Sequence, residues 1–288
     1  MQLYQTHSPA NPVLFVHIPK TAGTALFALA AKIYGRIPGR IDPCIFHLPM
    51  NWHEFDDTEE LAQAIAKRRE RRICFISGHC TYAIRKHLPY SPRMISMLRN
   101  PSSRVISAYN NMRRDPNNGY HSTAIRMSLH EALQERAIPE LENGQVRRIG
   151  GLPPHIGPLT QDHLELAKHN LDKHFAVIGF TERFDETVEL LRNTLGWPRK
   201  GYMPWNVAPK TSVKPKYSAA TSQLIEARNQ LDKNFYEYAE QRFEHQIARL
   251  QPDFHAGVER TRKYNQNWYR HWHKWGIAPV RHIKRLIK

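Results

Sequence analysis

A short loop near the start of the chain carries residue types that suit the binding of a phosphate group. The apolar run from Val13 to Ile18 is followed at once by the loop Pro19-Lys20-Thr21-Ala22-Gly23-Thr24. The Ala- and Leu-rich stretch from Ala25 to Tyr34 then predicts a helix, so the loop joins a strand to a helix. Backbone N–H groups at the helix N-terminus, two threonine hydroxyls and a lysine cation together form a predicted phosphate cradle.

This loop differs from the Walker A loop of P-loop nucleotide hydrolases. No G-x-x-x-x-G-K-[ST] motif occurs in the sequence, and Lys20 comes before Gly23. The simpler alternative is an ordinary turn between strand and helix, in which a threonine caps the helix. The residues alone leave both interpretations open.

A second candidate for anion binding lies in the segment LRNPSSRVISAY, residues 98–109. Met94 to Leu98 predicts a buried strand, and Arg99 stands at its carboxyl end, where open α/β sheets bind ligands. Asn100 suits the N-cap of the next helix, and Ser107 lies two turns inside that helix. An arginine in place of an aspartate at this point argues against a Mg²⁺–nucleotide site. The simpler alternative is a surface arginine and a helical serine with local hydrogen bonds.

His79 is the candidate base. It follows the apolar stretch from Ile73 to Ser77, which predicts a strand, and Gly78 leaves room beside it. Imidazole is the side chain whose ordinary pKa suits proton removal near neutral pH. The chain has 17 histidines, so the alternative is a buried, hydrogen-bonded histidine without a chemical role. The nearby Cys74 and Cys80 form no C-x-x-C motif or other closely spaced ligand set, so we expect no metal.

The remaining elements alternate between helix and strand. The stretches Thr160 to His174 and RFDETVELLRNTLG predict helices on either side of a strand from Ala176 to Phe180. This alternation predicts an α/β fold with a P-loop-like, open and mainly parallel sheet flanked by helices. A Gly- and Pro-rich passage at residues 150–159 predicts a loop, and residues 219–250 follow a helical pattern.

The composition is that of a folded protein. Of the 288 residues, 41% are hydrophobic and 24% are charged, which excludes collagen-like, mucin-like and fully disordered chains. The chain has 3 cysteines, an odd and small number that favours a reducing compartment. We expect a cytoplasmic protein, since the N-terminus shows no leader pattern and no apolar run approaches the ~18 residues that span a bilayer.

Positive charge is concentrated towards the C-terminus. The 42 Lys and Arg residues exceed the 26 Asp and Glu residues, which gives a formal net charge of +16. We predict an α/β domain over residues 1–254 and a basic, Trp-rich helical extension over residues 255–288. The helical spacing of Trp268, Trp272 and Trp275 supports that extension. The extension either packs on the domain or makes peripheral contact with an anionic membrane surface.

Two segments together resemble the cofactor motifs of sulfotransferases that use 3′-phosphoadenosine-5′-phosphosulfate (PAPS), particularly the carbohydrate family that contains heparan sulfate 2-O-sulfotransferase. These segments are FVHIPKTAGTAL, residues 15–26, and LRNPSSRVISAY, residues 98–109. Weaker similarities occur in FISGH (75–79), NGQVRRIGG (143–151), VIGFTERFDETVELL (177–191) and LDKNFYEYA (231–239). Some relatives carry a second histidine two positions before the one that matches His79, where this chain has Ser77.

The resemblance implies the transfer of a sulfuryl group from PAPS to a hydroxyl of a carbohydrate or glycoconjugate acceptor. The residues implied to bind the 5′-phosphosulfate are Lys20, Thr21, Ala22, Gly23 and Thr24. Arg99 and Ser107 are implied to bind the 3′-phosphate. His79 is then the base that takes the hydroxyl proton, and Lys20 neutralises charge on the departing phosphate.

The sequence gives less evidence about which residues bind the acceptor. Arg113, Arg114, Arg147 and Arg148 suit an anionic glycan because arginine matches carboxylate and sulfate, yet solvated surface charge explains them equally well. The alternative function is a non-enzymatic protein that binds a polyanion, nucleic acid or sulfated glycan, through its net charge of +16. The sulfotransferase interpretation predicts no nucleic-acid partner.

Overall fold

A parallel sheet of five strands forms the centre of the computed structural model, which describes residues 12–34, 45–47, 73–88, 91–153, 156–202 and 217–274. In chain order the strands are β1 (Val13–Val16), β2 (Ile45–His47), β3 (Phe75–Gly78), β4 (Arg93–Leu98) and β5 (Phe175–Phe180). Their order across the sheet is β2-β3-β1-β4-β5, and every neighbouring pair is parallel. The predicted α/β fold is therefore confirmed, whereas the short edge strand β2 was not predicted.

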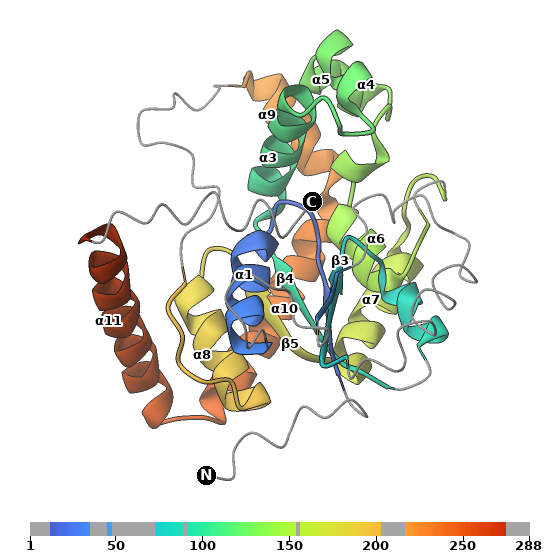
Figure 1. Ribbon diagram of the computed structural model, residues 1–288. Helices are drawn as coiled ribbons and strands as arrows, with labels where there is room; N and C mark the ends of the chain where they lie inside the picture. Colours follow the sequence, from blue (N-terminus) through green and yellow to red (C-terminus); the bar gives the residue numbers. More distant parts are fainter. Residues whose placement is uncertain are drawn as a thin grey trace.

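Helices cover both faces of this sheet (Figure 1). In chain order they are α1 (Gly23–Tyr34), α3 (Pro101–Arg114), α4 (His121–Arg126), α5 (Leu129–Gln134), α6 (Gly144–Gly150), α7 (Gln161–His174), α8 (Phe184–Leu195), α9 (Ala219–Arg228), α10 (Gln230–Ala248) and α11 (Asp253–Lys274). Two 3₁₀ helices are η1 (Tyr82–His87) and η2 (Pro139–Leu141). Figure 1 shows α1 and α8 on one side of the sheet and α7 on the other, while α3, α4, α5 and α9 gather beyond the strands. Helix α10 packs against α7.

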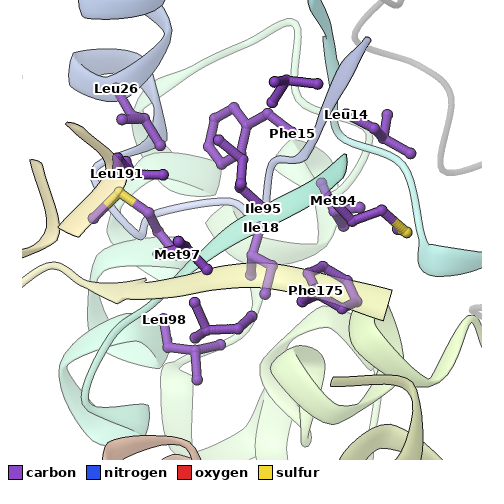
Figure 2. Packing of buried hydrophobic residues seen from close by; sticks show 14 of the residues in the cluster. Leu14, Phe15, Ile18, Leu26, Met94, Ile95, Met97, Leu98, Phe175 and Leu191 are labelled. Carbon is purple, nitrogen blue, oxygen red and sulfur yellow. The ribbon is translucent and has the colours of Figure 1, made fainter. Parts of the chain in front are cut away.

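The core lies on both faces of the sheet, which explains why its strands are short apolar runs and not alternating patterns. All residues of β1 are 0% exposed. Leu26 of α1 and Leu191 of α8 belong to the same cluster as Ile95 and Met97 of β4 (Figure 2). A second, smaller cluster joins α3, α5 and α9. The main cluster holds the carboxyl ends of β3, β1 and β4 side by side.

The helical pattern of residues 219–250 forms two helices, α9 and α10, that are separated at Asn229. Asn229 is 1% exposed, and its side-chain amide donates to the carbonyls of Leu141 and Ile225 at 3.0 Å each. Its Oδ1 accepts the backbone N–H of Asn143 at 2.9 Å. An asparagine that bonds backbone groups in this way competes with a continuous helix, so the chain turns there.

Helix α11 crosses the predicted boundary between residues 254 and 255. Phe254 and Val258 are 2% and 3% exposed and belong to the main cluster. Thr261 donates from Oγ1 to Glu189 of α8 at 2.7 Å. The first turns of α11 therefore pack on the α/β domain, and the division into two parts stays a prediction.

Further along α11, Trp268 packs between two distant segments. The Nζ of Lys32, in the last turn of α1, lies 3.8 Å from the centroid of its ring. The same ring lies so close to Gly201 that a Cβ there would meet it at 2.2 Å. The side chain of Trp272 and the whole of Trp275 lie outside the described part of the chain, so membrane contact stays a prediction. Within the described ranges, none of the helices combines the length and apolar character that crossing a membrane requires.

Candidate functional site

The predicted site residues lie at the carboxyl ends of three neighbouring strands. β1 pairs with β3 on one side and with β4 on the other, with Val16 opposite Gly78 and Ser96. The loop after β1 therefore lies between His79, which follows β3, and Arg99, which follows β4. One edge of the sheet thus carries an imidazole, a lysine loop and an arginine in a row.

The loop after β1 has a backbone conformation that residues other than glycine rarely adopt. Lys20 and Ala22 both have left-handed backbone angles, with φ of 69° and 61°. Thr21 is 0% exposed and donates from Oγ1 to the carbonyl of Ile18 at 2.8 Å. The carbonyl of Ala22 accepts the N–H of Ala25 at 3.0 Å, which begins α1. The N–H groups of Gly23 and Thr24, the first two residues of α1, precede any carbonyl of the helix that could accept them.

Lys20 reaches from this loop to α3. Its Nζ donates to Oδ1 of Asn111 at 3.1 Å. Burial, followed by the nearby cations of Arg114 and Arg99, lowers the pKa of Lys20 to about 8, while Asp115 acts in the opposite direction. The lysine therefore lies in a setting that already holds an excess of positive charge.

Arg99 connects the two predicted anion-binding elements. Its Nη1 donates to the backbone carbonyl of Lys20 at 3.2 Å, and burial lowers the pKa of its guanidinium. Asn100 caps α3 as predicted, since its side chain accepts the N–H of Ser103 at 3.1 Å. Ser107 is half-buried and stands one turn before Asn111, so both residues lie on the face of α3 that contacts the loop.

His79 contacts a second histidine, His17, which sequence reasoning did not select. The two ring centroids are 4.5 Å apart with an interplanar angle of 65°. His17 is 8% exposed and stacks on Phe15 at 5.2 Å. Its ring lies against Gly23, where a Cβ would meet it at 2.1 Å. The sequence did carry a signal for this residue, because His17 is the one polar residue in the apolar run from Val13 to Ile18.

The contact between His17 and His79 bears on the absence of a histidine at position 77. This serine occupies the position where some relatives carry a second histidine, and it is 0% exposed. Its hydroxyl makes no hydrogen bond within the described residues. The imidazole beside His79 comes instead from the end of β1, the neighbouring strand.

The surface-charge interpretation of Arg147 and Arg148 was wrong, because both side chains are buried and bonded within the protein. Each residue is 5% exposed. Arg147 donates to the carbonyls of Pro153 and Gly157 at 2.9 and 3.0 Å. Arg148 donates to the carbonyl of His79 at 2.5 Å and to Glu140 at 3.0 Å. Arg113 and Arg114 are exposed, and their role at an acceptor stays a prediction.

The cysteines near His79 are not arranged for metal binding. Cys80 is a buried free thiol, and burial raises its pKa to about 12. Across the ranges that the structure describes, no group of three or more His, Cys, Asp or Glu side chains could hold a metal ion. Cys80 is thus a protonated core residue at neutral pH.

Comparison with known proteins identifies the family. The model of the sulfotransferase family matches residues 6–250. The crystal structure of mouse sulfotransferase SULT7A1 complexed with PAP matches at 14% identity and a TM-score of 0.37, over 76% of this chain and 63% of that chain. This chain therefore spans less than two thirds of that protein. A comparison with curated proteins found no match. Because the family model covers most of its length, and in agreement with the resemblance of its motifs, the chain belongs to the sulfotransferase family.

Proposed function

We propose that this protein transfers the sulfuryl group of PAPS to a hydroxyl of a carbohydrate or glycoconjugate acceptor. The observation that carries the proposal is the contact at 3.2 Å between the guanidinium of Arg99 and the carbonyl of Lys20. A nucleotide with phosphate groups at two positions requires two cationic elements close together. Membership of the sulfotransferase family supports the reaction, and the motif resemblance supports the acceptor class.

The charges around the loop support an anionic ligand. The two arginines that depress the pKa of Lys20, Arg114 and Arg99, act on an amine that is also partly desolvated. A bound phosphate or sulfate group would reverse this effect, because an anion favours the charged form of the lysine. The positive end of the α1 dipole also attracts an anion to this loop. The residues present therefore fit the phosphosulfate end of PAPS.

The reaction requires a base on one side of the loop and a cation within it. PAPS, when bound, supplies a sulfuryl group whose bond to an oxygen of the 5′-phosphate breaks. His79 takes the proton of the acceptor hydroxyl while the acceptor oxygen forms its bond to sulfur. The electron pair of the broken bond leaves with the nucleotide, and Lys20 and the first N–H groups of α1 stabilise its charge. The ring of His17, which lies against Gly23 of the loop, contacts the ring of His79.

Replacement of His79 tests the assignment of the base. His79→Ala should lower turnover with radiolabelled PAPS and a panel of glycan acceptors by about 10²- to 10⁴-fold, the usual contribution of a general base. The affinity for adenosine 3′,5′-bisphosphate (PAP) should stay close to that of the unchanged protein. His169→Ala serves as a control, because His169 is exposed on α7. Equal losses of turnover and PAP affinity would contradict the role of His79 as base.

The response to PAP separates this function from non-enzymatic binding of a polyanion. PAP at 100 times its dissociation constant should stabilise the folded protein by about 2.7 kcal/mol, which a thermal shift detects. A protein that only binds polyanions would show no response to PAP. It would instead bind nucleic acid and sulfated glycans alike, with affinity that falls steeply as salt is added.

A further inference from the structure

Helix α6 is buried along its whole length although it carries two arginines and a glutamine. It lies within the segment NGQVRRIGG, and every residue from Gly144 to Gly150 is buried. Buried polar side chains need hydrogen-bond partners inside the protein. Two of these side chains, Gln145 and Arg148, find their partners in the backbone of Arg99 and His79.

Gln145 holds Arg99 by both of its backbone groups. Gln145 is 0% exposed, and its Oε1 accepts the N–H of Arg99 at 2.9 Å. Its Nε2 donates to the carbonyl of Arg99, also at 2.9 Å. The side-chain amide therefore pairs with this residue as a neighbouring strand would. The backbone at the end of β4 is fixed, so the guanidinium of Arg99 projects from a defined position.

Arg148 holds His79 in a comparable way. It stands three residues after Gln145, so the two side chains leave the helix on one face. Its Nη1 donates to the carbonyl of His79 at 2.5 Å, and its Nη2 donates to Oε2 of Glu140 at 3.0 Å. Bonds from a charged donor are stronger than bonds between neutral groups. The backbone of His79 is thus fixed by a side chain whose own direction Glu140 determines.

Buried charges from two other helices hold α6 in place. Asp232 of α10 is 0% exposed and accepts the N–H groups of Gln145 and Val146 at 3.0 and 2.8 Å. Arg104 of α3 is also 0% exposed and bonds to Glu140 at 3.2 Å. The Nη2 of Arg104 lies 3.8 Å from Oδ2 of Asp232. A network of this kind has few alternative arrangements, because each buried charge would lose its partner if the helix moved.

We propose that α6 is a positioning element that sets the distance between the 3′-phosphate site and the catalytic base. Gln145 positions Arg99, and Arg148 positions His79, from one short helix. This inference rests on the proposed function, in which Arg99 binds the nucleotide and His79 takes the proton. In-line transfer depends on this distance, since a misplacement of about 1 Å lowers the rate of such reactions by about 10²-fold.

Two variants should separate the two positioning roles. Gln145→Met keeps the side-chain volume without its hydrogen bonds, and it should weaken PAP binding by about tenfold with little change in kcat at saturating PAPS. Arg148→Met should lower kcat by about 10²-fold with little change in PAP affinity. Arg148→Lys, which retains one charged donor, should restore part of the lost kcat.

The control for both variants is Arg147→Met, on the same helix. Arg147 is equally buried, but it bonds to the carbonyls of Pro153 and Gly157 and to neither site residue. We expect Arg147→Met to lower the melting temperature and to leave both kcat and PAP affinity within about twofold of the unchanged protein. The melting temperature of every variant is measured beside its kinetics.

Three results would count against these proposals in different ways. If Gln145→Met and Arg148→Met lose kcat and PAP affinity in equal proportion, α6 has only a structural role. If Arg147→Met behaves as Arg148→Met does, the same conclusion follows. If the unchanged protein transfers no sulfuryl group to any acceptor and does not bind PAP, the proposed function fails and the positioning role fails with it.

Discussion

Raising the pH from 7 to 9 should weaken the binding of PAP by about tenfold, because Lys20 loses its proton in that range. Burial, Arg114 and Arg99 lower the pKa of Lys20 to about 8 in the free protein. A bound phosphate restores the pKa toward the ordinary value of 10.5, since it places negative charge beside the amine. The complex therefore holds more protons than the free protein, and its formation is favoured at lower pH.

The size of the effect follows from the fraction of free protein whose Lys20 is charged. That fraction is about nine tenths at pH 7 and about one tenth at pH 9 for an amine of pKa about 8. The ratio corresponds to about 1.4 kcal/mol of binding free energy. The phosphate groups of PAP add little to this change above about pH 7.5, because their second pKa is about 6.

Isothermal titration calorimetry measures both the affinity and the proton uptake. Titrations at pH 7.5, 8.0, 8.5 and 9.0, each in two buffers of different ionisation enthalpy, should give an uptake of about half a proton per PAP at pH 8. Lys20→Arg is the matched variant, because arginine stays charged over this range. Burial lowers the pKa of Lys32 to about 8 as well. Lys32 lies at the far end of α1, bonded to the carbonyl of Gly201 at 2.7 Å, so its titration is the same with and without PAP.

Two results would refute this reasoning. The first is an affinity for PAP that does not change between pH 7.5 and 9 in the unchanged protein. The second is an equal loss of affinity in Lys20→Arg, which would assign the titration to another group. Either result would mean that Lys20 does not lie beside the bound phosphate of PAP.

Two further substitutions test the neighbours of Lys20. Arg99→Ala should weaken PAP binding by about 1.5 to 3 kcal/mol, the scale of a hydrogen bond to a charged group, and Arg126→Ala on α4 should not. Unchanged affinity in Arg99→Ala would contradict the 3′-phosphate site. Gly23→Ala should lower the free energy of unfolding in urea by about 1 to 3 kcal/mol, because the new Cβ would lie 2.1 Å from the ring of His17. Stability equal to that of the unchanged protein would mean that this ring moves aside freely.

Features that depend on neighbouring residues in the chain could be predicted from the sequence. The units around β1 and β4 were predicted because an apolar run, a loop and a cap follow one another directly, and Asn100 does cap α3. The run α7, β5 and α8 was predicted for the same reason. The strand β2 was not predicted, since its three residues are too few to show a period.

Features that depend on contacts between distant segments could not be predicted. His17 and His79 belong to different strands, and their contact follows from the pairing of β1 with β3. The burial of Arg147 and Arg148 contradicts the usual exposure of arginine, because carbonyls and Glu140 from other segments satisfy their charges. No local pattern distinguishes such arginines from surface arginines.

The packing of α11 bears on how this protein is divided for expression. Similarity to the family ends at residue 250, whereas Phe254 and Val258 continue the main cluster beyond it. A fragment cut at the limit of similarity would leave apolar side chains of α8 exposed to water and Glu189 without Thr261. The sequence similarity thus ends at residue 250, whereas the packed core continues into α11. Shortened versions should retain the first turns of α11 through Trp268, whose ring also covers the last turn of α1.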